Sequence, residues 1–169
     1  MKLYMVRHGI ALDIGEQGVT RDFDRPLSES GQRKTAAAGR GLRAMGCRPD
    51  VIGSSPLVRA WQTAECLRAV YDEPPELEVC DFMAPGGSPV DLVTWCNTHP
   101  PQSTLMLVGH MPDVAWHTHE LLVEEDRQPL PFKKAAVACI AFPDRARIEG
   151  GRLEWFKQPR TLREAGMNT

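Results

Sequence analysis

The sequence predicts an α/β fold, and we expect a three-layer α/β/α sandwich around a mostly parallel central sheet. Short apolar runs alternate with longer segments whose apolar residues recur at helical spacing, the pattern of a sheet covered by helices on both faces. Two of the runs end alike: the first leads into Arg7-His8-Gly9, and a second, a hundred residues later, leads into Gly109-His110. Both pairs should therefore project from the end of a strand.

The predicted strands are short apolar segments bounded by loops and turn-forming residues. The last two of them form a closing pair at the end of the chain. The expected strands span residues 2–6, 51–53, 77–79, 104–108, 135–142 and 152–156.

Four helices are expected between these strands. Ser28 is a good N-cap residue for the first, Gly46 suits its C-terminal end, and Gly39 and Gly41 weaken its middle. Pro56 lies at the start of the second helix, and a Gly-Gly-Ser-Pro turn opens the third. The expected helices span about residues 29–45, 57–70, 89–96 and 113–123, and residues 11–26 form a polar loop.

Composition limits the function only mildly. At 169 residues with 42% hydrophobic content, the chain predicts a single domain over residues 1–169 with a substantial core. The 20 basic and 22 acidic residues give a net charge of −2, which offers no electrostatic case for nucleic acid or an anionic membrane as partner. We expect no signal peptide and no bilayer-spanning segment, and hence a cytoplasmic protein. The five cysteines are odd in number and lack C-x-x-C spacing, so reduced thiols are expected.

The two histidines should meet if the strands that precede them are parallel neighbours. Ligands bind open α/β sheets at the carboxyl ends of such strands, so His8 and His110 would share one edge with Arg7. Arg59 follows the turn after the second strand and would enter from the first turn of a helix at the same edge. Each of these residues alone is more often a surface or salt-bridged side chain. Together, two imidazoles and two guanidiniums indicate a site for a transferable phosphoryl group.

Four segments make the chain resemble the histidine phosphatase superfamily, the phosphoglycerate-mutase-like proteins, and within it the short SixA-type phosphohistidine phosphatases. The resemblance covers nearly the whole chain and implies a nucleophilic role for His8 and phosphate binding by Arg7, Arg59 and His110. The matching segments are Arg7-His8-Gly9, Arg25-Pro26-Leu27-Ser28 with Gly31, Ser54-Ser55-Pro56 with Arg59, Gln62 and Thr63, and Gly109-His110-Met111-Pro112.

The sequence departs from the family pattern at a few positions. Ile10 and Met111 stand where relatives often carry an acidic residue and Asn, respectively, and neither position carries the core chemistry. The family's proton donor is usually a carboxylate after the third strand, where Asp81 is the nearest match; a plain surface aspartate is the alternative interpretation. Arg25 is expected at the rim of the substrate site.

The resemblance implies a two-step reaction that needs no metal or other cofactor. His8, neutral at the attacking nitrogen and held at the other by a backbone acceptor, would form a phosphohistidine intermediate that water then hydrolyses to phosphate. Arg7, Arg59 and a protonated His110 would hold the equatorial oxygens of the phosphoryl group. His117 and His119, two residues apart on a helix, should point to different faces rather than bind a metal.

The substrate is expected to be large. Residues 79–104 leave room for one helix and turns but not for a large cap subdomain, so the site should be open. That suits a phosphorylated histidine on a phosphorelay or phosphocarrier protein. Two alternatives stay open: a phosphatase of small phosphate monoesters, and a non-catalytic module that binds phosphoproteins. A mutase is disfavoured because no cap would retain an intermediate.

Overall fold

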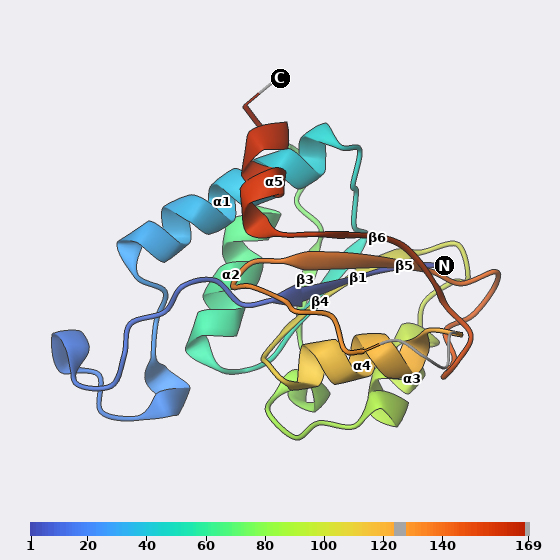
Figure 1. The fold of residues 1–169 in the computed structure, drawn as a ribbon, viewed down its shortest axis with the longest axis horizontal. Helices are drawn as coiled ribbons and strands as arrows, with labels where there is room; N and C mark the ends of the chain where they lie inside the picture. The colour runs from blue at the N-terminus through green and yellow to red at the C-terminus, as the bar shows by residue number, and fades with distance from the viewer. Residues whose placement is uncertain (124–127, 168–169) are drawn as a thin grey trace.

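The computed structural model describes residues 1–123 and 128–167, which contain one six-stranded sheet (Figure 1). The strand order across the sheet is β3-β2-β4-β1-β5-β6, so the first strand of the chain lies beside the fourth. The strands are β1 (Lys2–Arg7), β2 (Val51–Ser54), β3 (Glu76–Val79), β4 (Thr104–Gly109), β5 (Val137–Ala141) and β6 (Arg152–Lys157).

The sheet is mostly parallel, as predicted. Strands β1 to β4 run in the same direction, whereas β5 is antiparallel to β1 and β6 is antiparallel to β5. The register places Arg7 opposite Gly109 and Ser54 opposite Val108. The carboxyl ends of β1, β2 and β4 therefore finish at one edge, each directly followed by a segment singled out from the sequence.

The four predicted helices are present with ends that differ by a few residues, and a fifth, α5, was not predicted. The N-cap expected at Ser28 is confirmed, because its hydroxyl accepts a hydrogen bond of 3.0 Å from the backbone N–H of Gly31. The helices are α1 (Glu29–Ala44), α2 (Val58–Arg68), α3 (Pro89–Cys96), α4 (Asp113–Leu121) and α5 (Pro159–Ala165). Short 3-10 helices are η1 (Glu16–Gly18), η2 (Asp22–Asp24) and η3 (Asp81–Met83).

Helix α5 explains why α1 carries glycine in its middle. A Cβ atom at Gly41 would collide with the backbone carbonyl of Leu162, so the two helices can approach this closely only without a side chain there. Leu162 is fully buried in the core beneath α1. The glycine that weakens α1 by its propensity is therefore required by packing.

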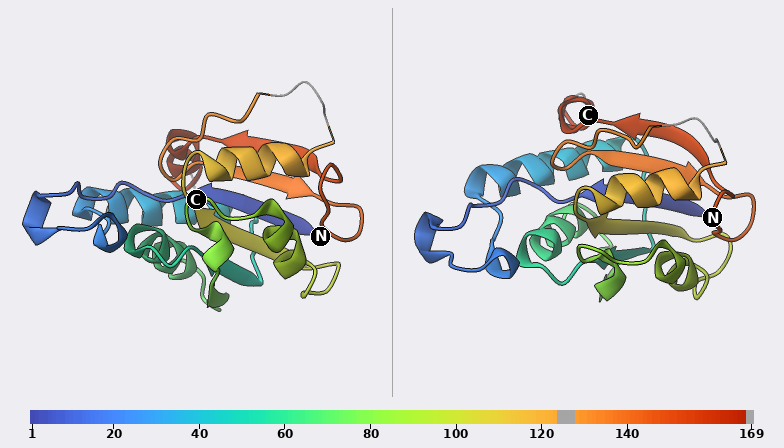
Figure 2. Two further views of the ribbon diagram at one scale, coloured as in Figure 1. Left: turned by 90° about the horizontal axis from the view of Figure 1, so that it is seen from below. Right: turned by 60° about the horizontal axis from the view of Figure 1, so that its bottom comes forward.

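Helices cover both faces of the sheet, which confirms the three-layer sandwich (Figure 2). Along β1, Leu3 and Met5 pack in the core under α3 and α4, whereas Tyr4 and Val6 pack in the core under α1, α2 and α5. This alternation follows from the two-residue period of a strand. Apolar side chains on both faces explain why the central strands read as continuous apolar runs.

The segment between β3 and β4 contains only η3 and α3, so no large cap subdomain covers the sheet edge. Among the residues that the structure describes, no helix is both long and apolar enough to cross a membrane.

Candidate active site

The edge formed by the carboxyl ends of β1, β2 and β4 brings together the four residues predicted from the sequence. His8 and His110 directly follow β1 and β4, and their ring centroids are 5.1 Å apart. Arg7 is the last residue of β1, and Arg59 lies in the first turn of α2. His8, Arg59 and His110 are buried, so these polar groups form an enclosed cluster rather than a solvated rim.

His8 is held with one ring nitrogen committed and the other free. Its Nδ1 lies 2.7 Å from the carbonyl oxygen of Gly9, which can only accept, so Nδ1 must carry a proton. Burial lowers the pKa of His8 to about 3, and the ring is therefore neutral at physiological pH. A neutral ring protonated at Nδ1 leaves a lone pair on Nε2, the state that a nucleophilic histidine requires.

Two contacts hold the backbone that fixes His8. The N–H of Gly9 donates to the hydroxyl of Thr63 (2.9 Å), which itself donates to the carbonyl of Arg59 (2.7 Å). A Cβ atom at position 9 would collide with the hydroxyl of Thr35, so the turn can pass this close to α1 only with glycine. The β1 turn and helix α2 are thereby joined directly beneath the site.

His110 is a neutral ring in the site formed by the protein groups alone, because burial and the nearby charge of Arg59 lower its pKa to about 4. The expected protonated His110 concerns the site that holds a phosphoryl group and stays a prediction. Its Nε2 lies 2.8 Å from the hydroxyl of Ser55, which also accepts a long hydrogen bond from the N–H of Leu57. If the hydroxyl donates to Nε2, then Nδ1 of the neutral ring carries the proton and can still donate to an anion.

Three nitrogen atoms of this cluster are buried and have no hydrogen-bond partner among the described residues: Nε of Arg7, Nε of Arg59 and Nδ1 of His110. Buried donors without partners are costly and uncommon in native proteins. Two guanidinium donors and one imidazole nitrogen at one sheet edge match the oxygens of a tetrahedral oxyanion.

Three other guanidinium nitrogens of Arg7 and Arg59 donate to the surrounding chain. Arg7 Nη1 donates to the carbonyl of Phe132 at 2.7 Å. Arg59 Nη1 and Nη2 donate to the carbonyl and the carboxylate of Asp22 at 2.7 and 3.0 Å. These contacts set the orientation of both guanidinium planes, so their free donors are held in place before any ligand binds.

Asp22 is a residue of the site that the sequence did not indicate. It lies in the polar loop of residues 11–26, and its carboxylate bridges Arg25 and Arg59. The hydrogen bond from Arg25 lowers the pKa of Asp22, so this carboxyl is ionised and unsuited to donate a proton at neutral pH. The only feature of the sequence that could have indicated Asp22 as a site residue is its position three residues before Arg25.

Arg25 holds the loop rather than pointing freely at the rim. Its three guanidinium nitrogens donate to the carbonyl of Leu12 and to the carboxylates of Asp13 and Asp22, at 2.6 to 3.0 Å. Substrate binding by Arg25 therefore stays a prediction, and its observed contacts are those of a residue that braces the loop carrying Asp22.

Asp81 begins η3 just after β3, where the sequence placed it, and its side chain is exposed. Helix η3 runs from the end of β3 back to the end of β4, where Met83 lies against Gly109. The acidic residues whose charges influence the pKa of His110 are Asp22 and Asp113. A role for Asp81 as proton donor stays a prediction.

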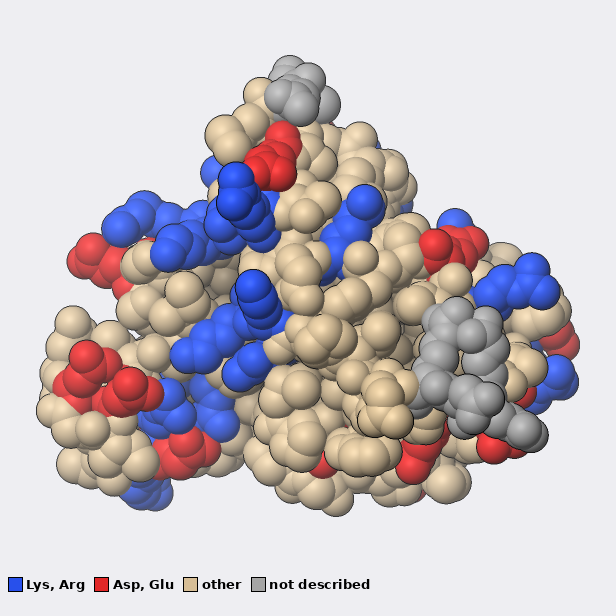
Figure 3. Space-filling model, viewed as in Figure 1, with Lys and Arg blue, Asp and Glu red and all other residues tan. Residues whose placement is uncertain are grey.

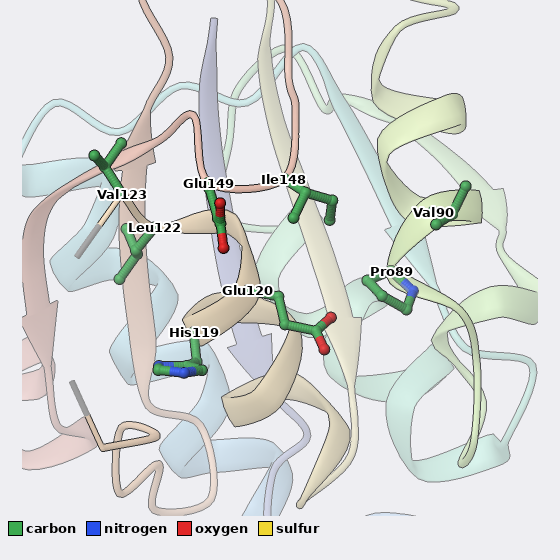
Figure 4. A pocket seen from close by; sticks show the side chains of 8 residues that line it. All are labelled: Pro89, Val90, His119, Glu120, Leu122, Val123, Ile148 and Glu149. Atoms are coloured by element: carbon green, nitrogen blue, oxygen red, sulfur yellow. The ribbon is translucent and has the colours of Figure 1, made fainter. Parts of the chain in front are cut away.

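A cavity of about 480 Å³ lies away from these residues, at the C-terminal end of α4 (Figure 4). Leu122 in its wall forms a bridge with Gly151, just before β6, so the cavity is near the opposite edge of the sheet. His119 lines this cavity, whereas Nε2 of His117 lies 3.1 Å from the carbonyl of Gly87. Within residues 1–123 and 128–167, no group of three potential ligands could hold a metal ion.

The buried histidines predict acid-sensitive stability. In the unfolded chain both should titrate near pH 6.5, whereas the folded pKa values of His8 and His110 are about 3 and 4. Below pH 6.5 the unfolded chain therefore binds more protons than the folded protein does. The stability that the two neutral histidines contribute is fully present above pH 6.5 and is lost as the pH falls toward their pKa values in the folded protein. Urea titrations should show a loss of about 1–2 kcal/mol per histidine between pH 7 and pH 5.

The control for this prediction is His8→Gln, measured at the same two pH values. It should reduce the difference between them, because the variant has no ring that titrates at position 8. Equal pH dependence in His8→Gln and the wild-type protein would contradict the prediction.

The fold and the site define a class of α/β proteins that bind a phosphoryl group between arginines and histidines at the carboxyl edge of a parallel sheet. The family model of the histidine phosphatase superfamily (branch 1) matches residues 3–80, which include Arg7, His8 and Arg59. The chain belongs to the histidine phosphatase superfamily and is of the SixA type.

Three relatives illustrate the similarity. An uncharacterised protein of Picosynechococcus sp. is 35% identical over 139 residues, covering 81% of this chain and 82% of the relative. The phosphohistidine phosphatase SixA of Escherichia coli is 26% identical over 169 residues, covering 98% of each chain. A structure of the protein histidine phosphatase SixA with tungstate has a TM-score of 0.80 at 23% identity and covers 96% of this chain and 99% of its own.

Proposed function

We propose that the protein removes the phosphoryl group from a phosphohistidine side chain of another protein, with His8 as the nucleophile. The observation that carries this proposal is the unprotonated Nε2 of His8 beside three buried donors that lack partners. The similarity to the SixA phosphohistidine phosphatase of Escherichia coli supports the choice of substrate class.

The first chemical step is an in-line transfer. Nε2 of His8 forms a bond to phosphorus while the bond between phosphorus and the substrate imidazole breaks. The substrate ring, already protonated on its other nitrogen, takes the electrons of the broken bond and leaves as neutral imidazole. The unpaired donors of Arg7, Arg59 and His110 hold the three equatorial oxygens, where the negative charge of a loose transition state is concentrated. Water then attacks phosphorus, releasing phosphate and restoring His8.

Two structural features favour phosphohistidine over alkyl phosphate esters. The segment between β3 and β4 forms no cap, so this segment does not cover the sheet edge against a side chain on a protein surface. Asp22 beside Arg59 is ionised, and Asp81 is exposed at the end of β3, so neither has the environment of a buried neutral acid. An imidazole leaving group needs less proton donation than an alkoxide does.

The test is a comparison of kcat/KM on a phosphohistidine protein, free phosphohistidine and an alkyl phosphate. We expect both phosphohistidine substrates to exceed the alkyl ester by on the order of 10²-fold or more, the scale of a positioned proton donor. Preference for the alkyl ester would instead identify a phosphatase of small monoesters. Tight binding of the phosphoprotein without turnover would identify a binding module.

The contribution of Asp81 can be tested through the leaving group. If Asp81 donates a proton, Asp81→Asn should lower kcat/KM on an alkyl phosphate by roughly 10²-fold and have little effect on phosphohistidine or an activated aryl phosphate. A matched control is Asp91→Asn, an exposed aspartate in the first turn of α3. A uniform loss on all three substrates, or no loss on the alkyl ester, would exclude Asp81 as the acid.

A further inference from the structure

A basic groove opens beside the site. It has a volume of about 370 Å³ and lies between α1, α5 and the segment that precedes β5. Figure 3 shows Lys and Arg side chains gathered on this side of the molecule, over α1, α5 and the end of β1. The cationic residues that line the groove are Arg7, Lys34, Lys133, Lys134 and Arg163.

Within residues 1–123 and 128–167, this groove has no compensating charge. No Asp or Glu is among the described residues that line it, although the chain as a whole has a net charge of −2. The acidic side chains on the two flanking helices pair with other arginines: Glu29 with Arg33 on α1, and Glu164 with Arg160 on α5. In the described part of the chain, none of the lysines of the groove forms an ion pair with a carboxylate.

The groove is continuous with the wall of the phosphoryl site. Arg7 contributes to both, and its Nε is one of the buried donors without a partner. Thr35, whose hydroxyl also lacks a partner among the described residues, lines the groove and lies against Gly9, next to the nucleophile. A chain segment attached to a phosphohistidine at His8 would therefore meet the groove within a few residues.

We propose that this basic groove binds an acidic segment that flanks the phosphohistidine of the substrate protein, an inference that rests on the proposed function. Carboxylates of such a segment would face Lys34, Lys133 and Lys134 while the phosphoryl group enters between the arginines. Complementary charge of this kind accelerates encounter and selects among partners.

The make-up of the groove favours a protein segment over a second phosphate group. A built phosphate site holds its ligand with guanidinium donors in fixed positions, the role proposed for Arg7 and Arg59. The outer groove is instead supplied mainly by lysines, of which Lys34 and Lys133 are exposed on flexible stems. Mobile point charges spread over about 370 Å³ suit several carboxylates of varied position.

The experiment compares synthetic phosphohistidine peptides whose flanks contain Asp and Glu, or Lys, with free phosphohistidine. The double variant Lys34→Glu/Lys133→Glu should lower kcat/KM on the acidic peptide by about 10-fold or more at low salt, mainly through KM, and raise it on the lysine peptide. Free phosphohistidine, which cannot reach the outer groove, should change less than about 2-fold. The matched control is Arg147→Glu/Arg152→Glu, two exposed arginines near the opposite edge of the sheet.

The outcomes separate this proposal from the proposed function. If neither free phosphohistidine nor either phosphohistidine peptide is hydrolysed, the proposed function fails, and the groove proposal fails with it. Two outcomes would overturn only the groove proposal when free phosphohistidine is hydrolysed. One is equal kcat/KM of the wild-type protein on the acidic and the lysine peptide. The other is a loss of kcat/KM on the acidic peptide in the control variant as large as that in the groove variant. Inhibition by inorganic diphosphate that is weakened in the groove variant, without competition by an unphosphorylated acidic peptide, would identify a second phosphate subsite and overturn it as well.

Discussion

His8→Ala is expected to lower kcat by on the order of 10⁴-fold or more, because the variant has no atom that can form the bond to phosphorus. The motivating geometry is the neutral ring of His8, with Nδ1 committed to the carbonyl of Gly9 and Nε2 unprotonated. Steady-state hydrolysis of phosphohistidine measures the loss. Rapid-quench labelling of the wild-type protein should trap an acid-labile phosphoryl group on His8.

Two controls keep this expectation specific. His119→Ala removes an imidazole at the remote cavity and should leave turnover unchanged. Circular dichroism should show that His8→Ala remains folded, since the residue follows β1 at the sheet edge rather than lying in the apolar core. Turnover near the wild-type level in folded His8→Ala would exclude the covalent mechanism.

Arg59→Ala is expected to lower kcat/KM by on the order of 10³-fold, the scale of charge-stabilising arginines in phosphoryl transfer. Arg59 is buried, its Nη atoms are fixed by Asp22, and its Nε is free. Arg59→Lys should recover little of the loss, because an ammonium group cannot hold Asp22 and a phosphoryl oxygen with the same planar fork. The readout is kcat/KM on phosphohistidine at constant ionic strength.

Asp22→Asn is the matched variant for this measurement. It keeps the side-chain size and the backbone carbonyl that accepts from Arg59, and removes only the ionic part of the contact. Asp22→Asn should therefore lower kcat/KM on phosphohistidine much less than Arg59→Ala does. Retention of most activity in Arg59→Lys would show that Arg59 is not a forked phosphate ligand.

The placement of Arg7, His8, Arg59 and His110 at one edge was predictable from the sequence. Each follows an apolar run at a fixed spacing, and the β1, β2 and β4 strands are buried on both faces, so their hydrophobic pattern is strong and local. The carboxyl ends of parallel strands meet at one edge by geometry alone. The three-layer sandwich followed from the same alternation of apolar runs and helical segments.

Other features depend on contacts between residues far apart in the chain, for which spacing carries no signal. Asp22 reaches Arg59 across 37 positions, and α5 pairs with Gly41 in α1. The pKa of His110 depends on burial and on the charge of Arg59, which only the packed structure decides, and both lower it.

The sequence by itself determined the kinds of groups at the site and the strand ends that carry them, because both are set by local pattern. Only the tertiary structure decided which donors stay unpaired, which carboxylate fixes Arg59, and where Lys34 of α1 meets Lys133 before β5. These properties depend on burial and on nearby charges that come from segments far apart in the sequence. The spacing of residues along the chain does not reveal such contacts.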